Sequence, residues 1–422
     1  MMDFRALPSG DYTLANVTVP ACLLGQAGDL VRTDISIVGG CIGAPQAMVV
    51  DMGGAMVLPC FTDMHTHLDK GHIWGRAPNP DGTFMGALTT VAQDRGDNWS
   101  AEDVRTRMEF SLRCAYAHGT RALRTHLDSI PPQDDITWPV FRALRDDWAG
   151  RIDLQAVCLV GCDAMDPQGA FRHTADIVAA SGGVLGMVTY PVADLKHRLH
   201  GFLTLAADRG LAVDFHVDET MDPASETLRG IAEAVMETGF TAPVTVGHLC
   251  SLATQDPARA HDTLGIVARA GLNIVSLPMC NLYLQDRHPG RTPRGRGLTL
   301  VHEARARGIP VSFASDNTRD PFYAYGDLDM IEVMREATRI GHLDHAAPDW
   351  ITAFTTAPSQ ACGFDAAAFA IGAPADLVVC RARSWTELFA RPQADRIVLR
   401  DGRAIDRTLP DYAELDHLMR TA

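Results

Sequence analysis

The most informative stretch of the chain is Met64-His65-Thr66-His67-Leu68-Asp69-Lys70. His65 and His67 are two positions apart, so in an extended strand both imidazoles point to the same side and can reach one metal ion. A His-x-His pair alone is a weak signal, because two histidines in a loop or in the core give the same pattern. Its meaning depends on the polar residues that accompany it elsewhere in the chain.

Three further polar residues each follow a short apolar run. His216 ends one such run, His248 a second and Asp316 a third. Taken alone, each is more often a hydrogen-bonded structural residue than a ligand. Together with the His-x-His pair they end candidate strands, and parallel barrels build their active sites at the C-terminal ends of strands. Three histidines and one aspartate are a suitable ligand set for Zn²⁺ or Fe²⁺.

Short apolar runs alternate with helical patterns from about residue 57 to residue 316. The clearest helix is predicted over 100–118, because Ser100 can cap its start and Gly119 follows its end. Eight β-then-α units predict a (β/α)₈ TIM barrel, although an open doubly wound sheet would show the same alternation. The eight candidate strands are Val57–Cys60, Thr120–Thr125, Ile152–Leu159, Val184–Val188, Ala212–His216, Val244–Gly247, Asn273–Leu277 and Pro310–Ala314.

The two ends of the chain have a different pattern. Both contain short strand-like pieces broken by glycine, such as Tyr12–Val19 and Ala375–Cys380. Neither end is long enough to form a stable pair of sheets by itself. We therefore predict that residues 1–56 and 366–422 together form one small β-sandwich domain, and that residues 57–365 form the barrel.

Composition and charge restrict the possible partners. Apolar residues make up 46% of the 422 residues, which is enough for a large core. The chain has 37 Lys and Arg against 52 Asp and Glu, a formal net charge of −15 that argues against nucleic acid or an anionic membrane as partner. No signal peptide or long apolar run is visible, and the ten cysteines form no CxxC pair. We therefore expect a cytoplasmic protein with reduced cysteines.

Three other polar residues lie close to the candidate ligands in sequence. Glu219 follows His216 by three residues and can reach over a metal-bound water to move protons, although a solvated loop acid is equally consistent with this position. His126 and Asp128 end the second candidate strand. They can orient the ligands, or they can form a buried hydrogen-bonded pair.

These motifs resemble the amidohydrolase superfamily over essentially the whole chain. Within it the chain looks most like the branch of bacterial cytosine deaminase and N-isopropylammelide amidohydrolase. The resemblance implies a barrel with a β-sandwich from both chain ends, an oligomer, and iron or zinc as cofactor. The motifs that carry it are His65–Asp69, Arg124–Asp128, His216–Glu219, Asn281–Arg287 and Ser315–Pro321.

The resemblance also implies a role for each candidate residue. Glu219 is the acid/base that protonates a ring nitrogen. His248 lies beside the attacking water, and Asp316 accepts a proton as well as binding metal. The implied metal ligands are His65, His67, His216 and Asp316.

Two departures from the cytosine deaminase pattern concern the substrate. The glutamine that ends strand 3 there and reads the pyrimidine corresponds here to Gly161, and Asn317 replaces a second carboxylate after the ligand aspartate. The second feature looks more like the ammelide enzyme. We predict that the substrate-binding residues are Gly161, Asn317, Asp320 and Phe322.

Lysine usage predicts one metal ion rather than two. Two-metal amidohydrolases commonly bridge their ions with a carboxylated lysine at the end of strand 4. This chain has only two lysines, Lys70 and Lys196, and Lys196 lies beyond the fourth candidate strand in a helical pattern. We therefore expect a single divalent ion, Zn or Fe.

The predicted activity is hydrolytic deamination of a small, cytosine-like aminated nitrogen heterocycle. A bound ion would make hydroxide available at neutral pH, and attack on the amidine carbon would release ammonia. Two other hydrolytic reactions are alternatives: release of an alkylamine from a triazine, and ring opening of a cyclic amide. A non-catalytic binding protein is a third possibility, and it would be expected to have lost ligands. The expected partners are a small molecule and further copies of the chain.

Overall fold

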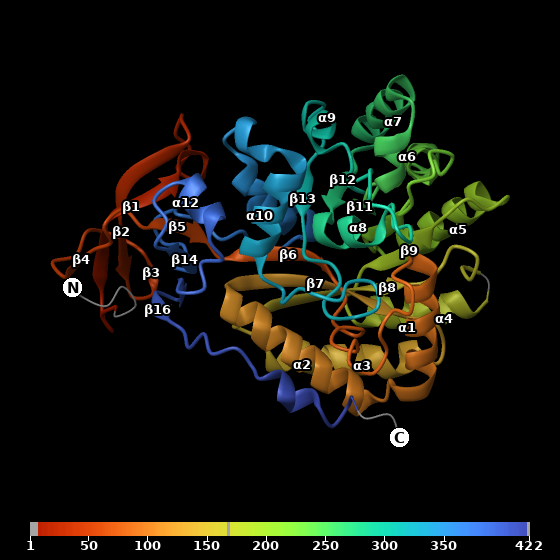
Figure 1. Ribbon diagram of the computed structural model, residues 1–422, viewed down its shortest axis with the longest axis horizontal. Coiled ribbons are helices and arrows are strands. Elements are labelled where there is room, and N and C mark those ends of the chain that lie inside the picture. The colour runs from red at the N-terminus through yellow and green to blue at the C-terminus, as the bar shows by residue number, and fades with distance from the viewer. Residues whose placement is uncertain (1–6, 167–168, 420–422) are drawn as a thin grey trace.

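The computed structural model describes residues 7–166 and 169–419, and its strands fall into two groups of different kind (Figure 1). Strands from both chain ends form an antiparallel-rich sheet on one side of the molecule. Parallel strands from the middle of the chain occupy the other side and are flanked by helices. This is a mixed α/β fold, as the alternation of apolar runs predicted.

Eight strands from the middle of the described chain pair only in parallel, in two sheets of order β6-β7-β8 and β13-β12-β11-β10-β9. Isolated parallel bridges join the sheets at both edges, at Thr66–Asp316 and at Val157–Val184. The C-terminal ends of all eight strands therefore meet on one face. The strands are β6 Phe61–Thr66, β7 Thr120–Asp128, β8 Asp153–Leu159, β9 Leu185–Thr189, β10 Val213–Val217, β11 Val244–His248, β12 Asn273–Ser276 and β13 Val311–Phe313.

Helices follow the parallel strands in sequence, and α2 shows how local signals set their ends. The backbone N–H of Asp103 donates to the Ser100 hydroxyl, and Gly119 ends the helix with a φ of 98°. Both features were predicted from sequence. The α-helices are α1 Phe84–Asn98, α2 Ala101–His118, α3 Gln133–Asp147, α4 Ala170–Ala180, α5 Leu195–Ala207, α6 Thr227–Thr238, α7 Pro257–Ala270, α8 Pro278–Leu284, α9 Val301–Arg305, α10 Met330–Gly341, α11 Thr356–Cys362 and α12 Trp385–Ala390.

Short 3₁₀ helices complete the connections. They are η1 Ala21–Leu24, η2 Cys250–Thr254, η3 Leu343–His345, η4 Trp350–Phe354 and η5 Tyr412–Leu415.

The strands of the two chain ends share one sheet of order β16-β15-β14-β5-β1-β2-β3, with β4 beside β1. The two ends meet in the antiparallel pairing of β14 with β5, and a second antiparallel bridge joins Cys41 to Pro374. The strands are β1 Tyr12–Pro20, β2 Leu30–Val38, β3 Cys41–Ile42, β4 Val49–Asp51, β5 Met56–Pro59, β14 Leu377–Cys380, β15 Ile397–Arg400 and β16 Arg403–Ala404.

One predicted strand belongs to a different sheet from the one expected. The run Val57–Cys60 was predicted as the first barrel strand, but it forms β5 and pairs with β14. The first parallel strand is instead β6, which pairs with β7. The local sequence pattern cannot separate β5 from β6, because residues 55–61 are continuously apolar and all buried. Only Cys60 lies between the two strands.

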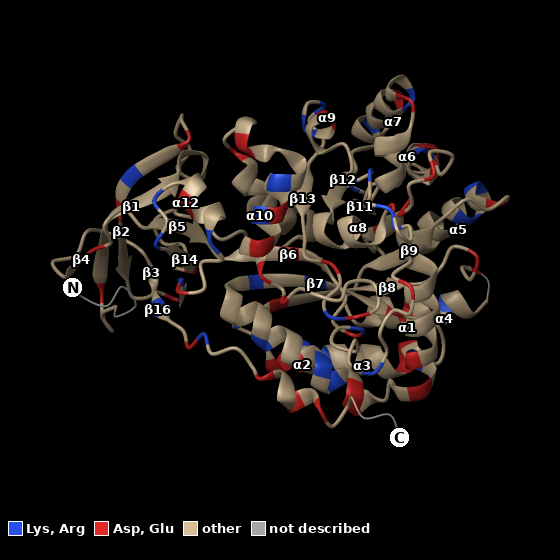
Figure 2. Ribbon diagram, viewed as in Figure 1, with Lys and Arg blue, Asp and Glu red and all other residues tan. Residues whose placement is uncertain are grey.

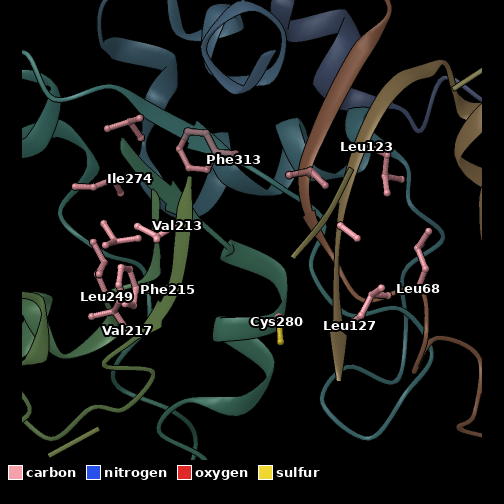
Figure 3. Packing of buried hydrophobic residues seen from close by; sticks show 14 of the residues in the cluster. Leu68, Leu123, Leu127, Val213, Phe215, Val217, Leu249, Ile274, Cys280 and Phe313 are labelled. Atoms are coloured by element: carbon pink, nitrogen blue, oxygen red, sulfur yellow. The ribbon is translucent and has the colours of Figure 1, made fainter. Parts of the chain in front are cut away.

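The parallel strands are buried on both faces. On β10, Val213, Phe215 and Val217 are at most 1% exposed and pack in the large core that also contains Leu123 and Leu127 (Figure 3). Residues alternate between the two faces of a strand, so Asp214 and His216 point to the opposite, interior side. The apolar pattern of β10 thus places polar groups inside the ring of parallel strands.

Charged residues of both signs are interspersed over the helices rather than separated by sign (Figure 2). Among the described residues, none of the helices is both long and apolar enough to cross a membrane. The ten cysteines are all free thiols, and eight of them are buried.

Candidate metal centre and active site

Four side chains predicted as metal ligands converge at the C-terminal ends of β6, β10 and β13. The Nε2 atom of His216 lies 3.1 Å from Nε2 of His65 and 3.2 Å from Nε2 of His67. Oδ1 of Asp316 lies 3.6 Å from Nε2 of His65 and 3.2 Å from Nε2 of His67. Donor atoms that share one Zn²⁺ at about 2.0–2.2 Å stand roughly 3–3.6 Å apart, so the spacing fits a single ion.

The backbone turns sharply where two of these strands end. Asp316 has a φ of 66° and His248 a φ of 71°, both in the left-handed region that residues other than glycine rarely adopt. Such strained conformations collect at functional sites. The backbone N–H of Asp316 donates to the His65 carbonyl at 2.9 Å, which joins the end of β13 to β6.

The buried polar atoms of the cluster fit a bound cation. Both carboxylate oxygens of Asp316 are buried and have no hydrogen-bond partner. Burial lowers the pKa of the three imidazoles well below the ordinary value, which keeps them neutral as ligands must be. Burial, together with the nearby carboxylates of Asp320 and Asp63, raises the pKa of Asp316 to about 8, and the Lys70 charge offsets this only in part. A divalent ion would supply the rest of the compensating charge.

A fourth imidazole lies against the cluster. The His126 ring on β7 is centred 4.0 Å from that of His65, and its Nε2 lies 3.4 Å from Asp214 Oδ1. Asp214 Oδ2 in turn accepts a 2.8 Å hydrogen bond from Arg124. His126 was predicted as an orienting residue or as half of a pair with Asp128, and the structure pairs it with Asp214 instead. Asp128, the last residue of β7, instead forms ion pairs with Lys70 and Arg95, so its carboxylate is already occupied.

The loop after β10 is held so that Glu219 enters the site. Asp218, with a φ of 48°, accepts hydrogen bonds from Ser225, Thr227 and the Leu228 backbone, which ties the loop to the start of α6. Glu219 is thereby placed with its Oε1 3.4 Å from His248 Nδ1. Burial, and next the nearby Asp316 carboxylate, raise the pKa of Glu219 well above its ordinary value. Such an acid can hold a proton at neutral pH.

Asn281 is a site residue whose role the sequence did not reveal. Its Nδ2 lies 3.0 Å from His248 Nδ1 and 3.3 Å from Glu219 Oε1. Gln285, one turn later, donates to the Glu219 carbonyl at 3.2 Å. The motif Asn281–Arg287 was noted only for its resemblance, because nothing in its spacing indicates that Asn281 contacts residues 33 and 62 positions earlier.

Three of the predicted substrate-binding residues form one loop after β13. Asp320 accepts a 2.8 Å hydrogen bond from the Asn317 amide and two more from the Phe322 and Tyr323 backbone. Phe322 is 8% exposed, and the Lys70 ammonium lies 5.6 Å from its ring centre. Asp320 thus organises the loop, and contact of these residues with substrate stays a prediction.

Neither lysine is in a position to bridge two metal ions from strand 4. Lys196 on α5 is exposed and pairs with Glu237 at 2.8 Å. Lys70 is 4% exposed and pairs with Asp128 at 2.6 Å. Its position directly after the His-x-His motif brings a buried positive charge to the edge of the site.

Gly161, the remaining predicted substrate-binding residue, lies after β8 in a parallel bridge with Val188 at the end of β9. It therefore belongs to the same C-terminal face as the ligands, on the side formed by the third and fourth parallel strands.

With this geometry in view, comparison with known proteins gives the family. Residues 169–406, more than half of the chain, match the model of an amidohydrolase family. The chain is also 53% identical, over 96% of its own length and 96% of the relative's, to a pterin deaminase from Rhizobium rhizogenes. The chain belongs to the amidohydrolase family. The resemblance inferred from its motifs is thus confirmed.

Two solved structures share the fold. A 5-methylcytosine deaminase from Klebsiella pneumoniae aligns with a TM-score of 0.79 at 24% identity, covering 94% of this chain and 98% of that one. An N-isopropylammelide isopropylaminohydrolase from Burkholderia multivorans aligns with a TM-score of 0.72, also at 24% identity and covering 94% and 98%. At this level of identity the likeness concerns the fold alone.

Proposed function

We propose that this amidohydrolase is a metal-dependent deaminase that hydrolyses the 2-amino group of a pterin and releases ammonia. The pterin deaminase that is 53% identical over nearly the whole chain supports this substrate. The sequence predicted a cytosine-like ring, and a pterin contains a related aminated pyrimidinone, with the amino group at position 2 and the oxo group at position 4, fused to a second ring. A single-ring substrate is the second candidate, favoured by the fold shared with 5-methylcytosine deaminase.

We also propose that the eight parallel strands close into one (β/α)₈ barrel. The bridges Thr66–Asp316 and Val157–Val184 support closure, since they join the two parallel sheets at both edges. We further propose a β-sandwich domain from residues 1–56 and 366–422, with β5 added to it, and a barrel over the residues between. The continuous sheet from β16 to β3 and its own apolar core support this division.

One divalent ion, Zn or Fe, would be held by His65, His67, His216 and Asp316, because the Nε2 atoms of His65 and His67 each lie 3.1–3.6 Å from donor atoms of His216 and Asp316. When bound, such an ion lowers the pKa of a coordinated water to about 7, so that hydroxide becomes available at neutral pH. The donor set of three neutral imidazoles and one carboxylate suits either metal.

The remaining groups act on the substrate and on protons. Asp316 and His248 orient the attacking water, and Asp316 accepts its proton. Glu219 delivers a proton to the ring nitrogen beside the attacked carbon, so that negative charge does not build up there. A C–O bond forms, the C–N bond to the amino group breaks, and ammonia leaves after receiving a proton. The raised pKa of Glu219 supports this role.

The observation that carries the proposal is that the Glu219 carboxylate and the His248 ring approach each other to 3.4 Å beside the candidate ligands His65, His67, His216 and Asp316. The test is ammonia release by the purified, metal-loaded protein from pterin, cytosine and N-isopropylammelide, with formation of the dioxopteridine followed by its ultraviolet spectrum. We expect turnover of pterin at least tenfold more efficient than of the other two. Preference for cytosine would favour the single-ring candidate, and amine release from the ammelide would favour the triazine hydrolase.

Ring opening and binding without catalysis would each give a different outcome in the same assay. Opening of a cyclic amide would release no ammonia and would leave the amino group on the product. A non-catalytic binding protein would bind metal and ligand without turnover. All four candidate ligands are present, which favours an enzyme.

We further propose that the protein is cytoplasmic and forms a homo-oligomer. Light scattering of the purified protein would test its oligomeric state.

A further inference from the structure

The last stretch of the chain leaves the terminal sheet and runs along α2, outside the ring of parallel strands (Figure 1). We call residues 407–419 the C-terminal strap. Arg113 of α2 forms an ion pair with Glu414 at 2.5 Å. Leu415 is 4% exposed and packs with Phe110 on the same helix. The strap is thus attached to α2 by a polar and an apolar contact.

The strap also contacts the loop that follows β6, the strand of the His-x-His pair. Arg76 in this loop donates to the Leu418 carbonyl at 3.1 Å and forms a buried ion pair with Asp94 at 2.8 Å. A Cβ on Gly75 would lie 3.0 Å from the Met419 sulfur, so loop and strap are in close contact here. The final described residues of the strap therefore hold this loop.

Through Tyr412 the strap reaches the loop that follows β13 as well. The guanidinium of Arg319 lies 4.1 Å from the centre of the Tyr412 ring. Arg319 has a φ of 48°, in the left-handed region that residues other than glycine rarely adopt. Its neighbour Asp320 accepts a 2.8 Å hydrogen bond from Asn317 within the loop. A strained backbone persists only where surrounding contacts fix it, and the Tyr412 ring is one such contact.

The two loops are joined to each other where the strap touches them. The backbone N–H of His72 donates to the Thr318 carbonyl at 3.0 Å, and that of Trp74 donates to the Arg319 carbonyl at 2.9 Å. The ring centre of His72 lies 6.1 Å from that of Tyr412. Tyr412 therefore lies against both loops that begin at metal ligands, at the point where their backbones are bonded together.

We propose that Tyr412 is a positioning residue, which fixes the loop after β13 through its contact with Arg319. The effect on turnover rests on the proposed deaminase function, whereas the effect on the loop does not. The ligand Asp316 is held separately, since its backbone N–H donates to the His65 carbonyl at 2.9 Å. Loss of the contact should therefore displace the predicted substrate-binding residues further along the loop and leave the metal in place.

The kinetic test compares Tyr412→Ala with Tyr412→Phe in metal-loaded protein, with pterin as substrate. Tyr412→Ala removes the ring, so KM should rise by about 2- to 30-fold, the range of one cation–π contact. The kcat and the metal content should change by less than about twofold, because loss of binding common to the ground and transition states raises KM alone. Tyr412→Phe keeps the ring and loses only the hydroxyl, which donates to Asp327 at 3.2 Å. Its KM should stay within about twofold of wild type.

Arg319→Met tests whether the ring acts through the guanidinium, since methionine is a long side chain without charge. It should raise KM by a similar factor, and adding Tyr412→Ala should raise KM little further, because both changes remove the same contact. Leu409→Ala is the matched control, because Leu409 belongs to the same strap and is 43% exposed, as Tyr412 is. It should leave KM unchanged. Additive effects of the two main changes would refute the contact.

Hydrogen exchange measures the position of the loop without any substrate. The Arg319 N–H donates to the Tyr325 carbonyl at 2.9 Å, so displacement of the loop exposes this amide to water. In Tyr412→Ala, peptides covering residues 317–325 should exchange about 2- to 30-fold faster than in wild type, while those of β10 and β11 stay unchanged. Tyr412→Phe should exchange as wild type does.

The outcomes separate this inference from the proposed function. If the wild-type protein converts none of the candidate substrates, the proposed function fails, and faster exchange confined to residues 317–325 still supports the positioning role. In an active protein, an unchanged KM or an unchanged exchange rate over these residues refutes the positioning role and leaves the deaminase function standing. If Tyr412→Ala raises exchange throughout the chain, Arg319→Met decides in its place, because it leaves the packing of the strap on α2 intact.

Discussion

The side-chain amide of Asn281 donates to Nδ1 of His248 across 3.0 Å, while its second N–H points to Glu219 Oε1 at 3.3 Å. The amide nitrogen of Asn281 can only donate, and it faces both Glu219 Oε1 and His248 Nδ1. His248 therefore accepts at Nδ1 and carries its proton on Nε2, which has no partner in the described structure. That N–H is free to donate to an oxygen of the reacting species.

We predict that Asn281→Asp lowers kcat by about 10- to 100-fold, the range seen when a residue that orients an active-site group is changed. Aspartate has the same shape but cannot donate to Nδ1, so His248 would hold its proton on the wrong nitrogen. KM and metal content should stay near their wild-type values. Loss of metal would assign Asn281 a structural role, and an unchanged kcat would contradict the predicted His248 tautomer.

Glu219→Gln should lower turnover by about 10²–10⁴-fold and leave the metal bound. Glutamine keeps the size of the side chain but cannot supply the proton. Metal analysis beside steady-state kinetics checks both parts. Loss of metal would make Glu219 a ligand. Near-normal turnover would give the acid/base role to another carboxylate, with Asp163 and Asp320 the next candidates.

One tightly bound ion per chain is expected after exhaustive dialysis, because four donor atoms converge and neither lysine is placed to bridge two ions. Removing it with a chelator should abolish activity, and adding back one equivalent should restore it. Asp316→Asn removes a ligand charge and a proton acceptor together, so this variant should lose both metal and activity. Two equivalents of metal in the wild-type protein would refute the single-ion centre.

A buried ion pair links the terminal sheet to the helices around the parallel strands. Arg396, just before β15, donates to both carboxylate oxygens of Asp329 at the start of α10, at 2.7 and 2.5 Å. We predict that Asp329→Asn lowers the free energy of unfolding by about 3–5 kcal/mol at pH 7, because it leaves the arginine buried and unpaired. Asp344→Asn, at an exposed position, should cost less than about 0.5 kcal/mol.

The same pair predicts how stability changes in acid. Burial alone would raise the pKa of Asp329, but the Arg396 charge outweighs it and lowers the pKa to about 2. A carboxyl whose pKa is lower in the folded state stabilises the fold above its unfolded pKa of about 3.9 and loses that effect as pH falls towards 2. The difference between wild type and Asp329→Asn in denaturant unfolding should therefore shrink between about pH 4 and pH 2. A constant difference would show that the charge of Asp329 is not its cause.

Much of the site could be predicted because its residues mark the ends of strands. His65, His67, His216, His248 and Asp316 each end an apolar run, and parallel strands bring such ends to one face. Glu219 could be predicted from its short distance to His216 in the chain. The partner of His126 could not, because Asp214 and Asp128 are equally plausible until the strand order is known.

The sequence by itself determined the residue types, the strand-end positions and the family, since these depend on local periodicity and on motifs a few residues long. Only the tertiary structure decided that residues 56–59 join the terminal sheet, that Asn281 bridges His248 and Glu219, and that the Tyr412 ring lies against Arg319. The reason is physical. A buried apolar run can pair with either of two sheets, and side chains that are 33 positions apart or more meet only through the packing of whole strands and loops.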